Sequence, residues 1–155
     1  MLEKKNVSYL SLLFFLYCLP ILSQETLIST KKENTSKIEL GIRFGENFSL
    51  DAILPFHGST RLHPSATIND AGVVLGSYID WVWDLNQANG LKIYPGVGPE
   101  LWFYNGFDIG ISGDFGLEYT FNIPLTLGFD WRPGFTIINY HFRTNNWGFI
   151  ARYIF

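Results

Sequence analysis

The chain is poor in the residues from which thiol chemistry and most metal sites are built. It has one cysteine, Cys18, and three histidines among 155 residues. Cys18 lies in an apolar segment that we expect to be removed from the mature protein. The rest of the chain then has no thiol for a disulfide, a metal thiolate or a nucleophile. We therefore expect neither a cofactor nor a metal site.

Basic residues are also scarce. Lysine and arginine together number 11 against 14 aspartates and glutamates, which gives a formal net charge of −3. Proteins that bind DNA or RNA neutralise phosphates with clustered basic side chains. The sequence shows no basic patch of this kind, so we expect no nucleic-acid partner.

The N-terminal region has the layout of a secretory signal. Lys4 and Lys5 precede an apolar run over residues 9–22, which is shorter than the roughly 20 residues that cross a membrane as a helix. Basic start, short apolar core and polar exit are typical of a signal peptide. We predict a signal peptide over 1–23, a flexible periplasmic leader over 24–37 because this stretch has little apolar area to bury, and one domain over 38–155.

From residue 38 onward, apolar and polar residues alternate with a period of two. In the stretch 108–121, Ile111, Phe115 and Leu117 occupy one face, opposite Asp114 and Glu118. Such alternation is typical of β-strands. It predicts eight strands, of which 48–56 and 64–69 are the least secure: 38–45, 48–56, 64–69, 71–84, 91–104, 108–121, 123–137 and 147–155.

The predicted strands are long, and they segregate charge. Several have 13 to 15 residues, enough for the 9–11 tilted residues that cross a bilayer. Nearly every charge lies opposite the apolar face, where a membrane barrel has its lumen; a soluble barrel would turn its apolar face inward. We predict an all-β, antiparallel, up-and-down transmembrane β-barrel with a lumen charge network of eight acids and four bases: Glu39, Arg43, Asp51, Asp80, Asp84, Lys92, Glu100, Asp114, Glu118, Asp130, Arg132 and Arg152.

The sequence resembles a family of small bacterial outer-membrane β-barrel proteins, similar in size to the outer-membrane protein A/X-like eight-stranded barrels. The resemblance rests on the runs 116–125 and 130–133 and on the close at 151–155, and it covers residues 70–155 best. It implies a monomer in the bacterial outer membrane, in contact with its lipid and placed there by the barrel insertion machinery. It also implies a C-terminal insertion signal comprising Trp147, Phe149, Tyr153 and Phe155. Members of the family mostly lack an assigned activity.

Three functions remain open for such a barrel. An eight-stranded interior is just wide enough for side chains to fill, which favours a plugged lumen and a structural or interaction role in the cell envelope. A narrow cation-preferring pore lined by acids is the alternative. A lipid-modifying enzyme is the weakest, because His57, His63 and His141 all fall in predicted turns or loops and no base held by a third group is identifiable. We predict no catalytic residues and no enzyme activity.

Prolines inside the predicted strands need an explanation. Pro95, Pro99 and Pro133 lie within strands and Pro124 begins one. Because proline cannot donate to the ladder, we expect β-bulges at these positions. The alternative is a weakened seam beside strand 91–104 through which acyl chains reach the lumen.

Overall fold

The computed structural model describes residues 37–70, 72–85, 88–104 and 106–155, so the predicted signal peptide and nearly all of the predicted leader lie outside the described residues. No helix in this part of the chain is long and apolar enough to cross a membrane. The strands are β1 (Glu39–Gly45), β2 (Phe48–His57), β3 (Thr60–Asn69), β4 (Gly72–Trp81), β5 (Trp83–Asp84), β6 (Leu91–Tyr104), β7 (Phe107–Thr120), β8 (Leu125–Trp131), β9 (Gly134–Thr136), β10 (Phe142–Arg143) and β11 (Trp147–Ile154).

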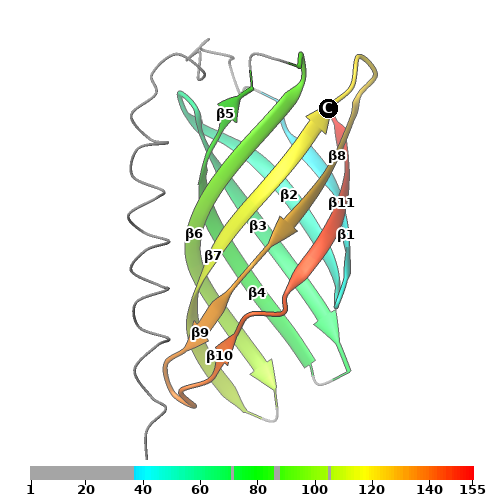
Figure 1. The fold of residues 1–155 in the computed structure, drawn as a ribbon. Coiled ribbons are helices and arrows are strands. Elements are labelled where there is room, and N and C mark those ends of the chain that lie inside the picture. The colour runs from blue at the N-terminus through cyan, green and yellow to red at the C-terminus, as the bar shows by residue number, and fades with distance from the viewer. Residues whose placement is uncertain (1–36, 71, 86–87, 105) are drawn as a thin grey trace, which may run out of the picture.

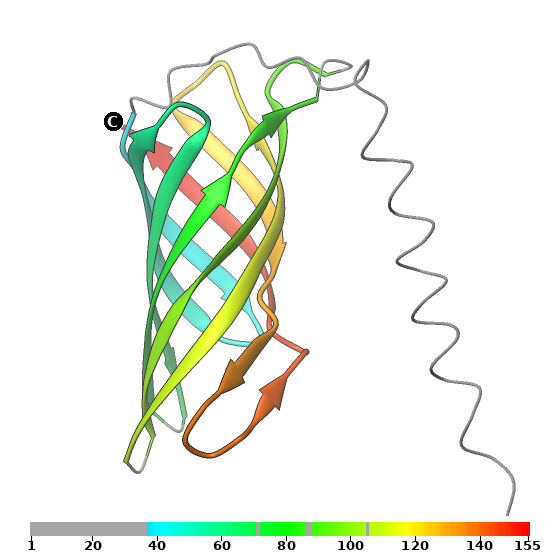
Figure 2. The ribbon, with the colours of Figure 1, turned by 90° about the vertical axis from the view of Figure 1, so that its left-hand side faces the viewer.

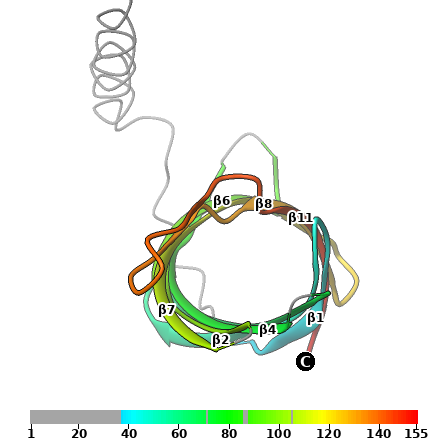
Figure 3. The same ribbon diagram turned by 90° about the horizontal axis from the view of Figure 1, so that it is seen from below.

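The strands form a closed antiparallel barrel (Figures 1 and 3). β5 continues β4 along β6, and β9 continues β8 along β7, so eight strands surround the lumen. The ring is complete because β1 pairs with β11 and β6 pairs with β7. The predicted all-β class and the predicted count of eight strands are confirmed.

The wall of the barrel is taller on one side than on the other. We call the end where β1 begins and β11 finishes the terminal end, and the opposite end, which carries the β9–β10 hairpin, the hairpin end (Figure 2). Toward the hairpin end the β1–β11 ladder stops at Gly45 and Gly148, whereas the β6–β7 ladder runs on to Phe103 and Phe107. The wall is therefore taller along β6 and β7.

Residues along the strands alternate between the outer and the inner face of the wall, except near the end of β2, where the pairing with β3 shifts by one residue between Pro55 and His57. Large apolar side chains lie outside and contact one another across strands, as in the Phe44–Phe149 and Phe129–Phe149 ring pairs at 6.0 and 5.4 Å between centroids. Charged side chains lie inside. The four residues of the predicted insertion signal, Trp147, Phe149, Tyr153 and Phe155, are all exposed on the outside; their role stays a prediction.

Strand β3 is longer than the sequence indicates, and this changes the interior. The prediction began it at residue 64, but the strand starts at Thr60 and pairs with β4 along its whole length. The prediction that His63 lies in a turn is therefore wrong: the side chain is fully buried, as is that of Arg61. The error arises because Pro64 follows His63 and reads as a break, although it interrupts only the pairing with β2.

Pro95, Pro99 and Pro133 leave the register of the ladder unshifted, whereas the β2–β3 pairing shifts between Pro55 and His57. Along β6 the partners in β4 and β5 keep one register, and the pairs at Tyr94, Pro95, Gly98 and Pro99 are missing. The predicted strand 123–137 is split at Pro133 into β8 and β9, which keep the same register on β7. The expectation of bulges at these prolines is wrong. Each one removes a donor, and the flanking pairs hold the strands in place.

Candidate functional site: a buried charge network

The lumen side of the wall is lined by charged side chains that are buried among one another. Of the twelve predicted members, nine are at most 3% exposed, whereas Glu39, Asp84 and Lys92 near the terminal end are partly exposed. The charged and histidine side chains that are at most 3% exposed are Arg43, Asp51, Arg61, His63, Asp80, Glu100, Asp114, Glu118, Asp130, Arg132 and Arg152, and Asp108 is 6% exposed. Because buried charges are costly unless paired, the geometry of the pairs decides what this interior can do.

Arg132 is the centre of the network. Its Nη2 lies 2.9 Å from both Asp51 Oδ2 and Asp130 Oδ2, and its Nε lies 3.3 Å from Asp114 Oδ1. Arg43 adds a second cation by donating from Nε to Asp130 Oδ1 at 2.6 Å. Arg132 belongs to neither β8 nor β9, since it lies in the gap between them. One guanidinium thus neutralises carboxylates from three strands.

A second cluster lies toward the terminal end. The Glu118 carboxylate accepts hydrogen bonds from Arg61 Nη1 at 2.7 Å and from Arg61 Nη2 at 2.9 Å, and it accepts another from Arg152 Nη2. Arg61 Nε donates to Asp80 Oδ2 at 3.0 Å, and Arg152 Nε donates to Glu39 Oε2 at 2.9 Å. Charge-assisted pairs of this kind are the stronger hydrogen bonds in proteins. They cross-link β1, β3, β4, β7 and β11 through the lumen.

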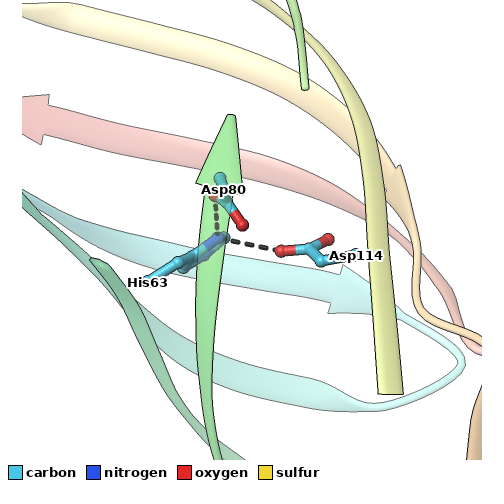
Figure 4. A group of neighbouring side chains, drawn as sticks. All are labelled: His63, Asp80 and Asp114. Carbon is cyan, nitrogen blue, oxygen red and sulfur yellow. Dashed lines mark hydrogen bonds and ion pairs between the residues drawn. The ribbon is translucent and has the colours of Figure 1, made fainter. Parts of the chain in front are cut away.

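His63 joins the two clusters. Its Nδ1 lies 3.0 Å from Asp80 Oδ2 and 2.9 Å from Asp114 Oδ2, and Figure 4 shows both carboxylates at the same edge of the ring. On the other edge, Nε2 lies 3.2 Å from Asp51 Oδ2 and 3.1 Å from Arg132 Nη2. The donor atoms of His63, Asp80 and Asp114 lie within 4.8 Å of one another, so these three residues could hold a metal ion.

A smaller cluster lies at the hairpin end around Glu100. Its carboxylate accepts hydrogen bonds from the Tyr78 hydroxyl at 2.6 Å and from Trp102 Nε1 at 2.9 Å. Arg143, from β10, donates to both oxygens at 3.1 and 3.0 Å and lies over the Trp102 ring, 4.5 Å from its centroid. The β9–β10 hairpin is thereby tied to the inner wall.

Glycines opposite the long side chains supply the room that this network needs. A Cβ at Gly148 would lie 2.7 Å from the guanidinium carbon of Arg43, and one at Gly76 would lie 2.5 Å from the Tyr78 hydroxyl. Real Cβ contacts are essentially never closer than 3.0 Å. Gly148 thus leaves room for the Arg43 side chain from the neighbouring strand β1, and Gly76 leaves room for the Tyr78 side chain two residues further along β4.

Arg61, His63 and Arg143 were not among the predicted members. In β3 the signal was present, since Arg61, His63, Ser65 and Thr67 alternate with Leu62, Pro64, Ala66 and Ile68. Arg143 follows a loop without periodicity and gave no such signal. His57 and His141 are exposed, at the end of β2 and beside β10. Asp108, which is 6% exposed and lies on the same face of β7 as Asp114, was also not predicted. The predicted ratio of eight acids to four bases therefore becomes nine to six, with His63 in addition.

No protein-family model, no curated protein and no solved structure matches the chain.

Proposed function

We propose that the protein is an integral β-barrel of the bacterial outer membrane whose lumen is filled by paired charges, and that it has a structural or interaction role in the cell envelope. The supporting observation is the inversion of polarity across the wall. Phe44, Phe129 and Trp131 on the outside are 50%, 42% and 41% exposed, while Arg43 and Arg132 inside are 0% and 1% exposed. An apolar surface that surrounds the whole barrel is stable against lipid and unfavourable against water.

The proposal of a filled lumen is supported by the pairing of the buried charges. The guanidiniums of Arg43, Arg61, Arg132 and Arg152 each lie against at least one carboxylate, and they come from different sides of the wall. A conducting ion would have to separate such pairs, and breaking a buried pair costs several kcal/mol. This supports a scaffold over an open pore.

A narrow cation-preferring pore is the second candidate. The observation that favours it is the excess of carboxylates over arginines and lysines along the lumen, because rings of acids select cations.

Location and conduction are tested separately. The full-length gene is expressed in a Gram-negative host, and the inner and outer membranes are separated on a density gradient. The proposal requires a heat-modifiable band in the outer-membrane fraction; recovery in the soluble fraction would contradict it. The purified barrel is then placed in planar bilayers, where we expect no discrete conductance steps. Steps whose cation preference falls in Glu100→Gln or Asp114→Asn would favour the pore.

The partners that we propose are the outer-membrane lipid and the barrel insertion machinery, and the proposed state is a monomer. Deleting Phe155 tests the insertion signal, because its ring is exposed and Tyr153 is its only close ring partner among the described residues. The deletion should lower the amount of folded barrel in the membrane while the purified variant still refolds in detergent. Unchanged amounts would remove Phe155 from the signal.

A further inference from the structure

Three buried carboxylate oxygens of the network have no hydrogen-bond partner among the described atoms: Asp80 Oδ1, Asp114 Oδ2 and Asp130 Oδ2. Asp80 is fully buried, and its Oδ2 accepts from Arg61 and lies against His63, but its Oδ1 has no partner among the described atoms. Asp114 shows the same asymmetry. Its Oδ1 accepts from Arg132, whereas its Oδ2 lies 2.9 Å from His63 Nδ1 without hydrogen-bond geometry. Unsatisfied buried oxygens are rare in native proteins and point to a water or an ion.

A proton on His63 Nδ1 leaves the unpartnered oxygens as they are. Nδ1 lies 3.0 Å from Asp80 Oδ2 and 2.9 Å from Asp114 Oδ2, and only the contact with Asp80 has hydrogen-bond geometry. A cation bound at Nδ1 would contact both carboxylates at once. The three donor atoms come from β3, β4 and β7. β3 and β4 are neighbours in the wall, and β6 lies between β4 and β7. Their positions are fixed by paired strands, as a preorganised site requires.

The surroundings of the three donors match those of known metal ligands. A metal-bound imidazole usually donates its other N–H to a carboxylate, and Nε2 of His63 lies 3.2 Å from Asp51 Oδ2, an oxygen that it shares with Arg132 Nη2. Ligating carboxylates are themselves hydrogen-bonded. Here Arg61 and Arg132 bond the oxygens of Asp80 and Asp114 and so fix their orientation.

We propose that His63 Nδ1 and the carboxylates of Asp80 and Asp114 bind one divalent transition-metal ion inside the barrel. One imidazole nitrogen with two carboxylates suits Zn²⁺, Mn²⁺ or Fe²⁺, whereas Mg²⁺ and Ca²⁺ favour sites made of oxygen alone. The ion cross-links three strands. The inference depends on the buried cluster and not on the membrane location, so it can fail while the proposed function stands.

The test loads the barrel with Zn²⁺ as it folds, because the site is buried. The full chain, purified folded in detergent, is unfolded in urea with a chelator and refolded with Zn²⁺ or with Mg²⁺. It is then desalted and analysed by elemental mass spectrometry. We expect about one Zn²⁺ per chain, no retained Mg²⁺, and at least a tenfold loss of bound Zn²⁺ in His63→Gln and Asp114→Asn. Glu100→Gln, which removes an equally buried carboxylate of the hairpin-end cluster, should retain the ion.

Folding of each variant is checked by its heat-dependent gel shift. If the ligand variants do not fold, X-ray absorption at the zinc edge of the wild-type barrel decides, since it distinguishes one imidazole with oxygen ligands from oxygen ligands alone. Failure of the wild-type barrel to retain Zn²⁺ would overturn the proposal, and so would a zinc spectrum without imidazole. Equal retention by a folded His63→Gln variant would also overturn it.

Discussion

The charges near the middle of the barrel and those at its hairpin end are held in different ways. Arg132 and Arg61 each contact at least two carboxylates and have side chains no more than 3% exposed. Among the described carboxylates, Arg143 is paired with Glu100, its side chain is 10% exposed, and it comes from the two-residue strand β10. Arg132 and Arg61 are each held by carboxylates from more than one strand, whereas the pair between Arg143 and Glu100 depends on the position of one short segment. Removing a charge should therefore have unequal effects in the two regions.

The largest expected effect is that of Arg132→Met. The substitution leaves Asp51, Asp114 and Asp130 without their shared cation, and breaking a buried pair in this way destabilises by about 3–5 kcal/mol. Urea unfolding in detergent, followed by tryptophan fluorescence, measures the free energy of unfolding. A loss below about 1 kcal/mol would mean that the carboxylates are neutral or screened by water.

Glu118→Gln should have the next largest effect. Glutamine keeps the shape of the side chain but removes the negative charge that Arg61 and Arg152 share. We expect a loss of about 3 kcal/mol in the same unfolding measurement, because Arg61 and Arg152 then keep only one carboxylate each, Asp80 and Glu39, and share a neutral amide. The double variant Glu118→Gln with Arg152→Met should lose less than the sum of the single variants. Strict additivity would show that the two side chains do not interact in solution.

The period-two pattern predicted the fold well because each strand buries charge on one face and exposes apolar groups on the other. Strand 91–104 was located to the residue, since Lys92, Glu100 and Trp102 alternate with Leu91, Val97 and Leu101 along its whole length. In β3 the small and polar outward residues weaken that contrast, so its first four residues were assigned to a turn. The pattern depends on contrast between faces and fails where an outward residue is not strongly apolar.

The charged members of the site were largely predictable, but their partners were not. Alternation places Asp80 and Asp114 inward, yet it does not reveal that both carboxylates meet the ring of His63. That contact depends on the register and on the closure of the ring, and neither is encoded in a single strand. Arg143 reaches Glu100 from an irregular segment, so only the three-dimensional path of the hairpin brings the two together.

Gly148→Ala should have an intermediate effect. A Cβ there would collide with the buried guanidinium of Arg43, which has no free space to move into because it is bonded to Asp130 and Asn146. Overpacking of this kind costs about 1–3 kcal/mol. Gly148→Val should cost more than Gly148→Ala in the same unfolding measurement. Equal stability of both variants and the wild type would show that Arg43 moves freely.

The smallest expected effect is that of Arg143→Met, the matched counterpart of Arg132→Met at the hairpin end. It removes one partly exposed partner of Glu100, while Tyr78 and Trp102 still donate to the carboxylate. We expect a loss of about 1 kcal/mol. Amide hydrogen exchange should be faster in β9 and β10 and unchanged in β1 and β11. A loss as large as that of Arg132→Met would contradict the difference between the two regions.

The pairing of β1 with β11 has a consequence for the order in which the molecule assembles. These strands share seven residue pairs, and the bond between Arg152 and Glu39 joins residues 113 positions apart. Contacts between such distant segments carry the largest loop-closure entropy and are slow to form. The ring cannot close before β11 is available, and until then β1 and β8 present unpaired edges that can template aggregation. A chain lacking β11 should therefore accumulate as aggregate instead of as a seven-stranded barrel.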